Sequence, residues 1–326
     1  MSGLGSELSP GAAMASSLGP VRRPPRPVPG GGTIRTGRYR DAVPRPSPIV
    51  LVLVGIASVQ LGAGVAKSLL DDVSPTALVW LRLATSSLIL LAWVRPRLGG
   101  RSRADLLVLL GFGASLGLMN LAIYQSFARI PLGIAVTIEF IGPLTLAVVG
   151  SRRARDLVWV GLAAVGVALL GAERADLDLV GVLWALVAGA CWASYILLSG
   201  ETGRRFAGLD GLAIASVVAL VLVSPFLLVG DATDGMFDPR ILAIGAAVGL
   251  LSSVIPYSCE LVALRSLRPA VFGILMSLEP AAAALAGILV IDETLTALQW
   301  LAVACVIAAS IGATRQRQVI AEPVPD

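Results

Sequence analysis

Apolar runs long enough to cross a lipid bilayer recur from Pro48 almost to the end of the chain. A helix needs roughly 17–25 residues to span the hydrocarbon core, and most of these runs reach that length. The chain therefore predicts an all-α membrane protein with ten transmembrane helices. The predicted helices occupy residues 48–70, 75–94, 105–125, 131–150, 157–171, 179–199, 212–230, 241–262, 269–291 and 297–313.

The composition favours a lipid environment. Hydrophobic residues make up 56% of the chain and charged residues only 14%, whereas a soluble domain carries roughly 25% charged residues to cover its surface. The absence of histidine excludes His–Asp catalytic sites, His-ligated zinc and histidine proton relays. The three cysteines lie singly within apolar runs, where they fit small apolar packing positions. We therefore expect neither a metal nor a cofactor.

Two polar segments flank the apolar part of the chain. Residues 1–47 are rich in Gly, Pro, Ser and Arg without any sustained apolar run, so we expect a disordered basic arm. A signal peptide would need an apolar stretch after the basic residues, which this arm lacks. Met1 and Met14 both remain candidate start residues. The segment 314–326 is predicted to be a cytoplasmic tail.

The arginines indicate how the chain is oriented in the membrane. If the N-terminus lies in the cytoplasm, the inner segments hold 20 arginines, while the outer loops hold only Arg129, Arg174 and Arg240. Basic residues concentrate on the cytoplasmic side of membrane proteins. We therefore predict a multi-pass protein of the cytoplasmic membrane with both termini in the cytoplasm. The arginines form short clusters between apolar runs and aromatic residues are few, so no nucleic-acid partner is expected.

A weak internal repeat divides the apolar part into two halves. Residues 130–143 (IPLGIAVTIEFIGP) resemble residues 267–280 (LRPAVFGILMSLEP), and both segments end on a proline inside a predicted helix. The halves 48–171 and 179–313 contain five predicted spans each, so the second half must cross the membrane in the opposite orientation. Inverted repeats are typical of secondary transporters, whose binding site lies where the halves meet.

Few ionisable residues fall inside the predicted spans, where a charge costs roughly 2.5–3.5 kcal/mol at a helix centre. Glu139 and Glu279 occupy similar faces of equivalent helices, so we expect them to approach each other and one of them to carry a coupling proton. The alternative is a structural pairing with Arg82 or with helix ends. Arg82 either binds a substrate carboxylate or forms a fixed ion pair between helices, and the ion pair is favoured. Lys67, the single lysine, either extends outward or points inward to a carboxylate.

Pro143 and Pro280 are predicted to interrupt the two equivalent helices. Each proline lacks a backbone N–H, which frees the carbonyl group four residues earlier, at Glu139 and Met276 respectively. Broken helices expose backbone groups to polar ligands in transporters. A simple kink is the alternative for either proline taken alone.

Polar uncharged side chains within the spans provide further candidates for a solute pathway. Asn120 is the single asparagine of the chain, and Tyr124 lies in the same predicted helix. Interhelical hydrogen bonding is the ordinary role of such residues. Trp192 and Tyr195 are more suggestive, because an aromatic pair within a span can line a cavity. Glu260 lies near the end of a predicted span, where a surface pair with a nearby arginine is expected.

Several stretches of the sequence carry a resemblance to a known family. They are ASVQLGAGVAKSLL (57–70), IPLGIAVTIEFIGPL (130–144) with SRR (151–153), GACWASYIL (189–197), and MSLEPAAAALAG (276–287) with ETLT (293–296). On these stretches the chain resembles the drug/metabolite transporter superfamily, in its EamA-type branch, and within that branch the subgroup of bacterial threonine/homoserine exporters. The resemblance extends over residues 48–315.

This resemblance implies ten helices, a central cavity between the halves, and amino-acid efflux driven by the proton gradient. We therefore expect a secondary active exporter of small amino acids similar to threonine and homoserine, or of related metabolites. An exporter of other metabolites, dyes or drugs with the same fold is the alternative. The cavity residues that the resemblance implies are Gln60, Lys67, Glu139, Trp192, Tyr195 and Glu279.

An intramembrane enzyme is not expected, because no histidine is present and no aspartate lies in the interior of a predicted span. The expected partners are a small-molecule substrate, protons and the lipid bilayer. A homodimer and a monomer both remain open.

Overall fold

The structure is a computed structural model that describes residues 47–96, 99–149, 157–172, 178–229, 232–264, 267 and 269–321. All of these belong to one unit, residues 46–326. The described residues form helices and turns without any strand, which confirms the predicted all-α class. Apart from residue 47, the expected basic arm lies outside the described residues.

The helices follow the apolar runs of the sequence. The first half contains α1 (Pro48–Lys67), α2 (Pro75–Val94), α3 (Arg103–Phe127), α4 (Leu132–Glu139), α5 (Ile141–Val149) and α6 (Leu157–Ala172). The second half contains α7 (Leu179–Arg205), α8 (Asp210–Val223), the 3₁₀ segment η2 (Ser224–Leu228), α9 (Pro239–Gly249), the π-helical segment η3 (Leu250–Val254), α10 (Ile255–Leu264), α11 (Pro269–Met276), α12 (Glu279–Ile291) and α13 (Ala297–Ala321).

Seven helical segments among the described residues are long and apolar enough to cross a membrane. Three shorter apolar segments, Leu132–Leu146, Leu157–Gly166 and Ala297–Gly312, coincide with the remaining predicted spans. The last helix continues to Ala321, so the predicted tail 314–326 begins as an extension of α13.

Capping residues determine where several helices begin. Ser74 accepts the backbone N–H of Ala77 at 3.1 Å, and Pro75 occupies the first turn of α2. Asp178 caps α7 in the same way by accepting the N–H of Val180 at 2.8 Å. Proline is tolerated in a first turn because its missing N–H would have no partner there.

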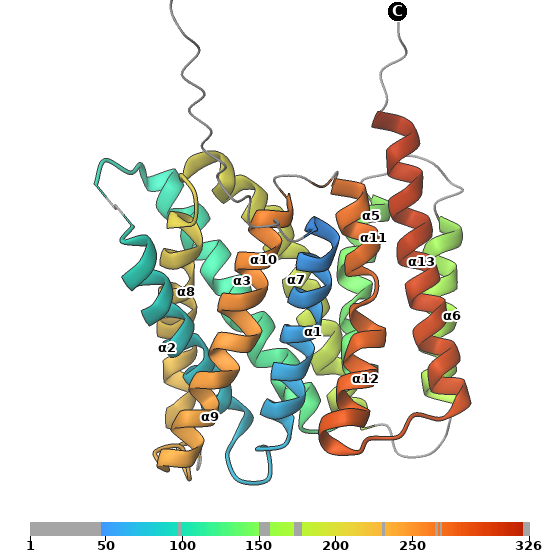
Figure 1. Cartoon of the computed structure of the whole chain (residues 1–326), viewed down its shortest axis with the longest axis horizontal. Helices are drawn as coiled ribbons and strands as arrows, with labels where there is room; N and C mark the ends of the chain where they lie inside the picture. The colour runs from blue at the N-terminus through green and yellow to red at the C-terminus, as the bar shows by residue number, and fades with distance from the viewer. Residues whose placement is uncertain are drawn as a thin grey trace, which may run out of the picture. The chain divides into compact units, whose positions relative to one another are not determined.

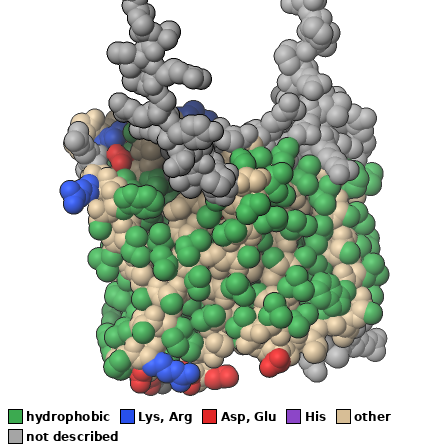
Figure 2. Space-filling view, in the orientation of Figure 1, with side chains coloured by type: hydrophobic (Ala, Val, Ile, Leu, Met, Phe, Trp, Pro, Cys, Tyr) green, Lys and Arg blue, Asp and Glu red, His purple; other side chains and the backbone are tan. Residues whose placement is uncertain are grey.

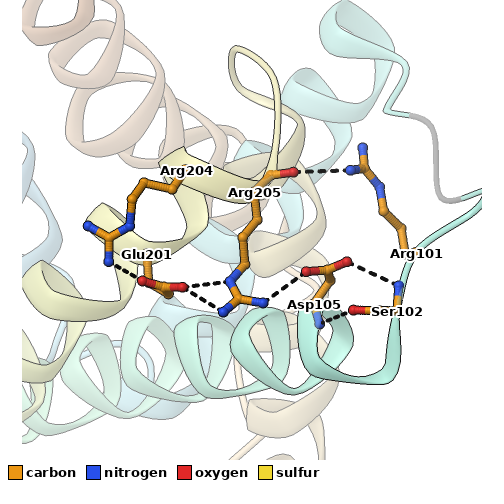
Figure 3. A network of polar contacts seen from close by, with 6 residues as sticks. All are labelled: Arg101, Ser102, Asp105, Glu201, Arg204 and Arg205. Atoms are coloured by element: carbon orange, nitrogen blue, oxygen red, sulfur yellow. Dashed lines mark hydrogen bonds and ion pairs between the residues drawn. The ribbon is translucent and has the colours of Figure 1, made fainter. Parts of the chain in front are cut away.

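A charged network joins the start of α3 to the end of α7 (Figure 3). Ser102 and Asp105 form a capping box at α3, and Asp105 Oδ1 also lies 3.0 Å from Arg205 Nη1. The Arg205 Nε donates to Glu201 at 2.7 Å within α7, and Glu201 also pairs with Arg204. These contacts hold the last turn of α7, which explains why this helix extends beyond the predicted end at residue 199.

The most extensive helix contacts connect the two halves of the chain. α3 packs along α7 and α8, while α1 packs along α10 and α12. α4 packs against both α7 and α12. α6 packs against α13 at one edge of the bundle (Figure 1). Helices α8 and α9 both pack against α2 at the opposite edge.

The outer surface of the bundle is apolar. Figure 2 shows hydrophobic side chains across the middle of the visible face, with charged side chains confined to its two ends. Leu88 and Leu289 are 69% and 75% exposed, and many other large apolar residues share this exposure. Soluble monomers rarely expose contiguous apolar surface of this extent, so the band matches the hydrocarbon core of a membrane.

Candidate functional site

A polar cavity of about 150 Å³ lies inside the bundle, and helices from both halves of the chain line it. Eight of the nine predicted pathway residues face this single cavity. They are Gln60, Arg82, Asn120, Tyr124, Glu139, Trp192, Tyr195 and Glu279. The ninth, Lys67, does not line it.

Two broken helices supply carboxyl groups to the cavity. Glu139 is the last residue of α4, and α5 begins at Ile141 after a single intervening residue. Glu279 is the first residue of α12, two residues after the end of α11. Pro143 lies in the first turn of α5, and Pro280 lies in the first turn of α12. Each break therefore places a glutamate where a helix ends or begins, and both glutamates are 8% exposed.

The break after Glu139 is packed tightly against α7. A Cβ atom on Gly189 would lie only 2.5 Å from the carbonyl oxygen of Glu139. Real Cβ atoms do not approach a backbone oxygen this closely, so glycine is required at this crossing. The GACW motif of α7 thus fixes the position of Glu139 through backbone contact.

Arg82 points from α2 to the π-helical segment η3. Its Nη2 donates to the carbonyl oxygen of Ser252 at 2.8 Å, and its Nε donates to Ser253 Oγ at 3.3 Å. Its guanidinium carbon lies 5.8 Å from the ring centre of Tyr124. No described carboxylate lies within ion-pair distance of Arg82. The favoured expectation of a fixed ion pair is therefore wrong, and the positive charge faces the cavity instead.

Pro256 explains why a carbonyl group is available to Arg82. In a regular α-helix, the carbonyl oxygen of Ser252 would accept from the backbone N–H four residues later, at the position of Pro256. Proline has no N–H, and the backbone there adopts the wider π-helical form. Ser58 on α1 donates to the adjacent carbonyl oxygen of Leu251 at 2.7 Å. Side chains from α1 and α2 thus bind this irregular backbone.

Lys67 forms a separate contact between the two halves. Its Nζ lies 2.5 Å from Glu293 Oε1 and donates to the carbonyl oxygen of Ile130 at 2.5 Å. The second carboxylate oxygen of Glu293 accepts the N–H of Leu132 at 2.8 Å. Lys67 therefore points inward to a carboxylate, which was one of its two predicted positions, but this carboxylate is outside the cavity.

The aromatic and amide residues of the cavity differ in the hydrogen bonds and packing contacts that they form. Asn120 donates to the carbonyl oxygen of Leu116 at 2.8 Å within its own helix, so it does not form the expected interhelical bond through this group. The Tyr124 hydroxyl is buried and has no hydrogen-bond partner among the described residues. Trp192 packs edge-on against Phe140, with ring centres 5.2 Å apart.

Glu260 is the cavity residue that sequence reasoning misplaced. It lines the cavity together with Tyr257, so the expected surface position is wrong. Arg265, the arginine considered as its partner, lies outside the described residues. The signal that could have identified Glu260 is Pro256 one turn earlier, because a proline inside a span marks irregular backbone near a site.

The charged groups of the cavity interact electrostatically with one another. Glu139 interacts electrostatically with Arg82. Glu279 interacts with both Glu260 and Glu139, and more strongly with Glu260. Glu139 and Glu279 therefore share their cavity with a third carboxyl group, that of Glu260.

These features define the class of protein. Its outer surface is apolar, its interior contains a polar cavity with charged side chains, and two broken helices end at that cavity. Charges inside a membrane protein mark pathways for ions or substrates, and broken helices at such sites are typical of secondary transporters. The fold and cavity are therefore those of a multi-pass membrane transporter.

Comparison with known proteins agrees with this class. The EamA-like transporter family matches residues 179–315. The threonine/homoserine exporter RhtA of Escherichia coli (strain K12) is 44% identical over 270 residues, which is 82% of this chain and 91% of that protein. RhtA of Salmonella typhimurium (strain LT2) is 43% identical over 272 residues, with the same two coverages. The uncharacterized transporter YwfM of Bacillus subtilis (strain 168) is 31% identical over 168 residues, covering 50% of this chain and 56% of that protein.

A solved crystal structure shares the fold. It superposes with a TM-score of 0.57 over 84% of this chain and 99% of its own, at 16% sequence identity. The chain belongs to the EamA-like transporter family, which confirms the resemblance found in its motifs. It is thus a membrane transporter and not an enzyme.

Proposed function

We propose that this protein is a proton-coupled secondary active exporter of small amino acids of the threonine and homoserine type. The observation that carries the proposal is the presence of Arg82 and Glu139, which interact electrostatically, on the wall of one small cavity. An amino acid is a zwitterion, and its two charged groups require one cationic and one anionic partner. The names of the relatives, which are threonine/homoserine exporters, support the same substrate class.

Arg82 is the partner for the substrate carboxylate. Guanidinium groups bind carboxylates through two parallel N–H donors. The contacts to Ser252 and Ser253 use Nη2 and Nε, which leaves Nη1 without a protein acceptor in the described part of the chain. Lys67 was the other candidate for this role, but its charge is paired with Glu293. Glu139 receives the substrate ammonium group, and the unpartnered hydroxyl of Tyr124 provides a further hydrogen-bonding group.

The size of the cavity favours a small substrate. A cavity of about 150 Å³ accommodates a molecule of roughly the size of benzene. Threonine and homoserine have a similar number of non-hydrogen atoms, whereas dyes and most drugs are several times larger. The alternative of dye or drug export would require the cavity to open much further.

The pattern of helix contacts supports an architecture of ten spans arranged as two inverted repeats, 48–171 and 179–313. In this architecture α1 corresponds to α7, α3 to the segment from α9 to α10, and α4 with α5 to α11 with α12. The packing of α1 on α10 then matches that of α3 on α7, and the packing of α1 on α12 matches that of α7 on α5. The pairs α2–α8 and α6–α13 each map onto themselves, as pairs of helices related by a two-fold axis must.

Contacts between loops support the alternation of spans. Arg101 donates to the carbonyl oxygen of Arg205 at 3.1 Å, so the loops after α2 and α7 lie at one end of the bundle. Ser74 donates to the carbonyl oxygen of Ala232 at 2.6 Å, so the loops after α1 and η2 lie together. The arginine-rich loops belong to the first group, and we assign that end and both termini to the cytoplasm.

The test is transport of labelled threonine by the purified protein in proteoliposomes, measured as exchange against unlabelled competitors. Threonine and homoserine should compete, whereas threoninol, which lacks the carboxylate, should not. Arg82→Gln should raise the half-saturating threonine concentration by at least about tenfold, because it removes a charged partner from a desolvated site.

Two controls accompany this experiment. Arg82→Lys keeps a cation in the cavity and should lose less affinity than Arg82→Gln. Arg129→Gln removes an arginine whose partner is Asp178, 3.6 Å away and outside the cavity, and should leave exchange close to wild type. Equal competition by threonine and threoninol would contradict recognition of the carboxylate, and the absence of any threonine exchange would contradict the proposed substrate.

A further inference from the structure

Glu260 gives the cavity more negative charge than an amino-acid substrate requires. Glu139, Glu260 and Glu279 line the cavity, and Arg82 is the one cation among its described lining residues. A bound zwitterion adds no net charge, so it cannot balance this excess. Uncompensated charges inside a membrane are strongly unfavourable. The excess must therefore be neutralised by bound protons, because the cavity offers no second basic side chain in the described part of the chain.

The carboxyl groups fall into two sets. Glu139 interacts with Arg82, and this pair accounts for the two charged groups of the substrate. Glu279 interacts most strongly with Glu260, which reaches the cavity from α10 while Glu279 begins α12. Neither Glu260 nor Glu279 forms an ion pair or accepts a hydrogen bond from any described residue. Two neighbouring carboxyl groups without cationic partners cannot both be ionised cheaply, so such pairs share a proton.

The surroundings of the pair agree with a site that holds a proton. The other titratable groups on the cavity wall are Arg82 from α2, Tyr124 from α3, Glu139 from α4, Tyr195 from α7 and Tyr257 from α10. Tyr195 and Tyr257 interact with each other and with Glu260. Gln60 from α1 is 4% exposed, faces the same cavity and has no described hydrogen-bond partner. It is an unpartnered buried polar side chain that a protonated carboxyl or an entering ligand can contact.

We propose that Glu260 and Glu279 form the carboxyl pair that carries the exchanged proton, while Arg82 and Glu139 bind the substrate. This inference rests on the proposed function and divides its cavity into two subsites. A carboxylic acid of the pair releases its proton to water on the cytoplasmic side, and the carboxylate takes up a proton from the outer side in the other half of the cycle. The carboxyl O–H bond is the one bond that breaks and re-forms, and no oxidant or reductant is needed.

The test is threonine uptake into proteoliposomes with and without an imposed gradient that is acid inside. The measured quantity is the ratio of the two initial rates, which reports coupling independently of the absolute activity. The wild-type ratio should be several-fold above one, and Glu260→Gln and Glu279→Gln should bring it to about one. Glu260→Asp keeps a carboxyl group and should restore a ratio above one. Glu139→Gln should instead raise the half-saturating threonine concentration by at least about tenfold while its ratio at saturation stays above one.

A second measurement, which needs no transport, tests a variant that folds but does not transport threonine. Addition of threonine to the purified wild-type protein in weakly buffered detergent should release protons, detected with a pH-sensitive dye. Glu260→Gln should release less than half of the wild-type amount. Asp71→Asn, which removes an exposed acid outside the cavity, should match the wild type in both assays.

The outcomes separate this inference from the proposed function. If the wild type does not exchange threonine, the proposed function is wrong. The second case is that the wild type exchanges threonine with a ratio above one, and Glu260→Gln keeps both that ratio and the full proton release. The assignment of the exchanged proton to the carboxyl pair is then wrong, although the proposed exporter function is not contradicted.

Discussion

The ammonium group of Lys67 lies 2.5 Å from the carboxylate of Glu293, and this contact joins the end of α1 to the loop after α12. The same carboxylate accepts the backbone N–H of Leu132 at the start of α4. One glutamate of the second half thus holds two elements of the first half. Both charged side chains are less than one-fifth exposed, which makes this contact less screened by solvent than a surface pair.

Glu293→Gln and Lys67→Met should each lower the stability of the protein. Removing one partner leaves the other charge poorly solvated, and we expect a loss of about 2 kcal/mol, between the values for exposed and fully buried pairs. The double variant should lose less than the sum of the single variants, because neither charge is then left alone. The measurement is the apparent unfolding temperature in detergent. Arg129→Gln, at the exposed pair with Asp178, should shift it far less, and additive single effects would contradict the coupling.

Gly189→Ala should destabilise the crossing of α4 and α7. The added Cβ would lie 2.5 Å from the carbonyl oxygen of Glu139, so the helices must separate at a cost of about 1–3 kcal/mol. The displacement should also raise the half-saturating threonine concentration, because Glu139 moves with its backbone. Gly200→Ala is the matched control in the same helix, since no atom lies within 4 Å of its added Cβ. It should be neutral or stabilise by up to about 1 kcal/mol, and equal effects of the two variants would exclude a steric cause.

Pro256→Ala should make the α9–α10 segment more regular while impairing transport. Alanine supplies the backbone N–H that the Ser252 carbonyl oxygen lacks, and this N–H competes with Arg82 for the same acceptor. Thermal stability should therefore change little, while the rate of threonine exchange falls. Pro239→Ala is the comparison, because Pro239 lies in the first turn of α9, where a backbone N–H has no helical partner. A wild-type exchange rate for Pro256→Ala would show that the π-helical form of η3 is dispensable.

Asp105→Ala should weaken the junction of α3 and α7. The carboxylate of Asp105 completes the capping box with Ser102 and also contacts Arg205, so its loss should cost about 1–2 kcal/mol (Figure 3). Hydrogen exchange should increase at the first turn of α3 and at the last turn of α7. Arg204→Gln changes a side chain that is 74% exposed and should have a much smaller effect. Faster exchange confined to α3 would show that the contact with Arg205 contributes little.

Much of the fold could be predicted because membrane helices appear in the sequence as long apolar runs. Each apolar run coincides with one or more helices, and the helix breaks fall beside Pro143 and Pro280. The grouping of Glu139 and Glu279 in one cavity followed from their equivalent positions in the repeat, without knowledge of any contact. These predictions depend on local composition and periodicity, which a single sequence contains.

Lys67 and Glu260 could not be placed by the same reasoning, because their positions depend on distant parts of the chain. Lys67 lies inside a predicted span, but its partner is a loop glutamate in the other half. Glu260 lies near the end of its predicted span with Arg265 just beyond, and this position favoured a surface pair. The π-helical segment before it changes which face of α10 points inward, and that segment depends on Pro256 and on Arg82 from α2.

The predominance of packing between the halves has a consequence for biosynthesis. α3 finds its main neighbours in α7 and α8, and α1 finds them in α10 and α12, all of which leave the ribosome later. The first helices therefore enter the bilayer before most of their partners exist. Their insertion and orientation must be decided by hydrophobicity and by the flanking arginines alone, and the cavity with its costly charges closes only when the second half has been translated.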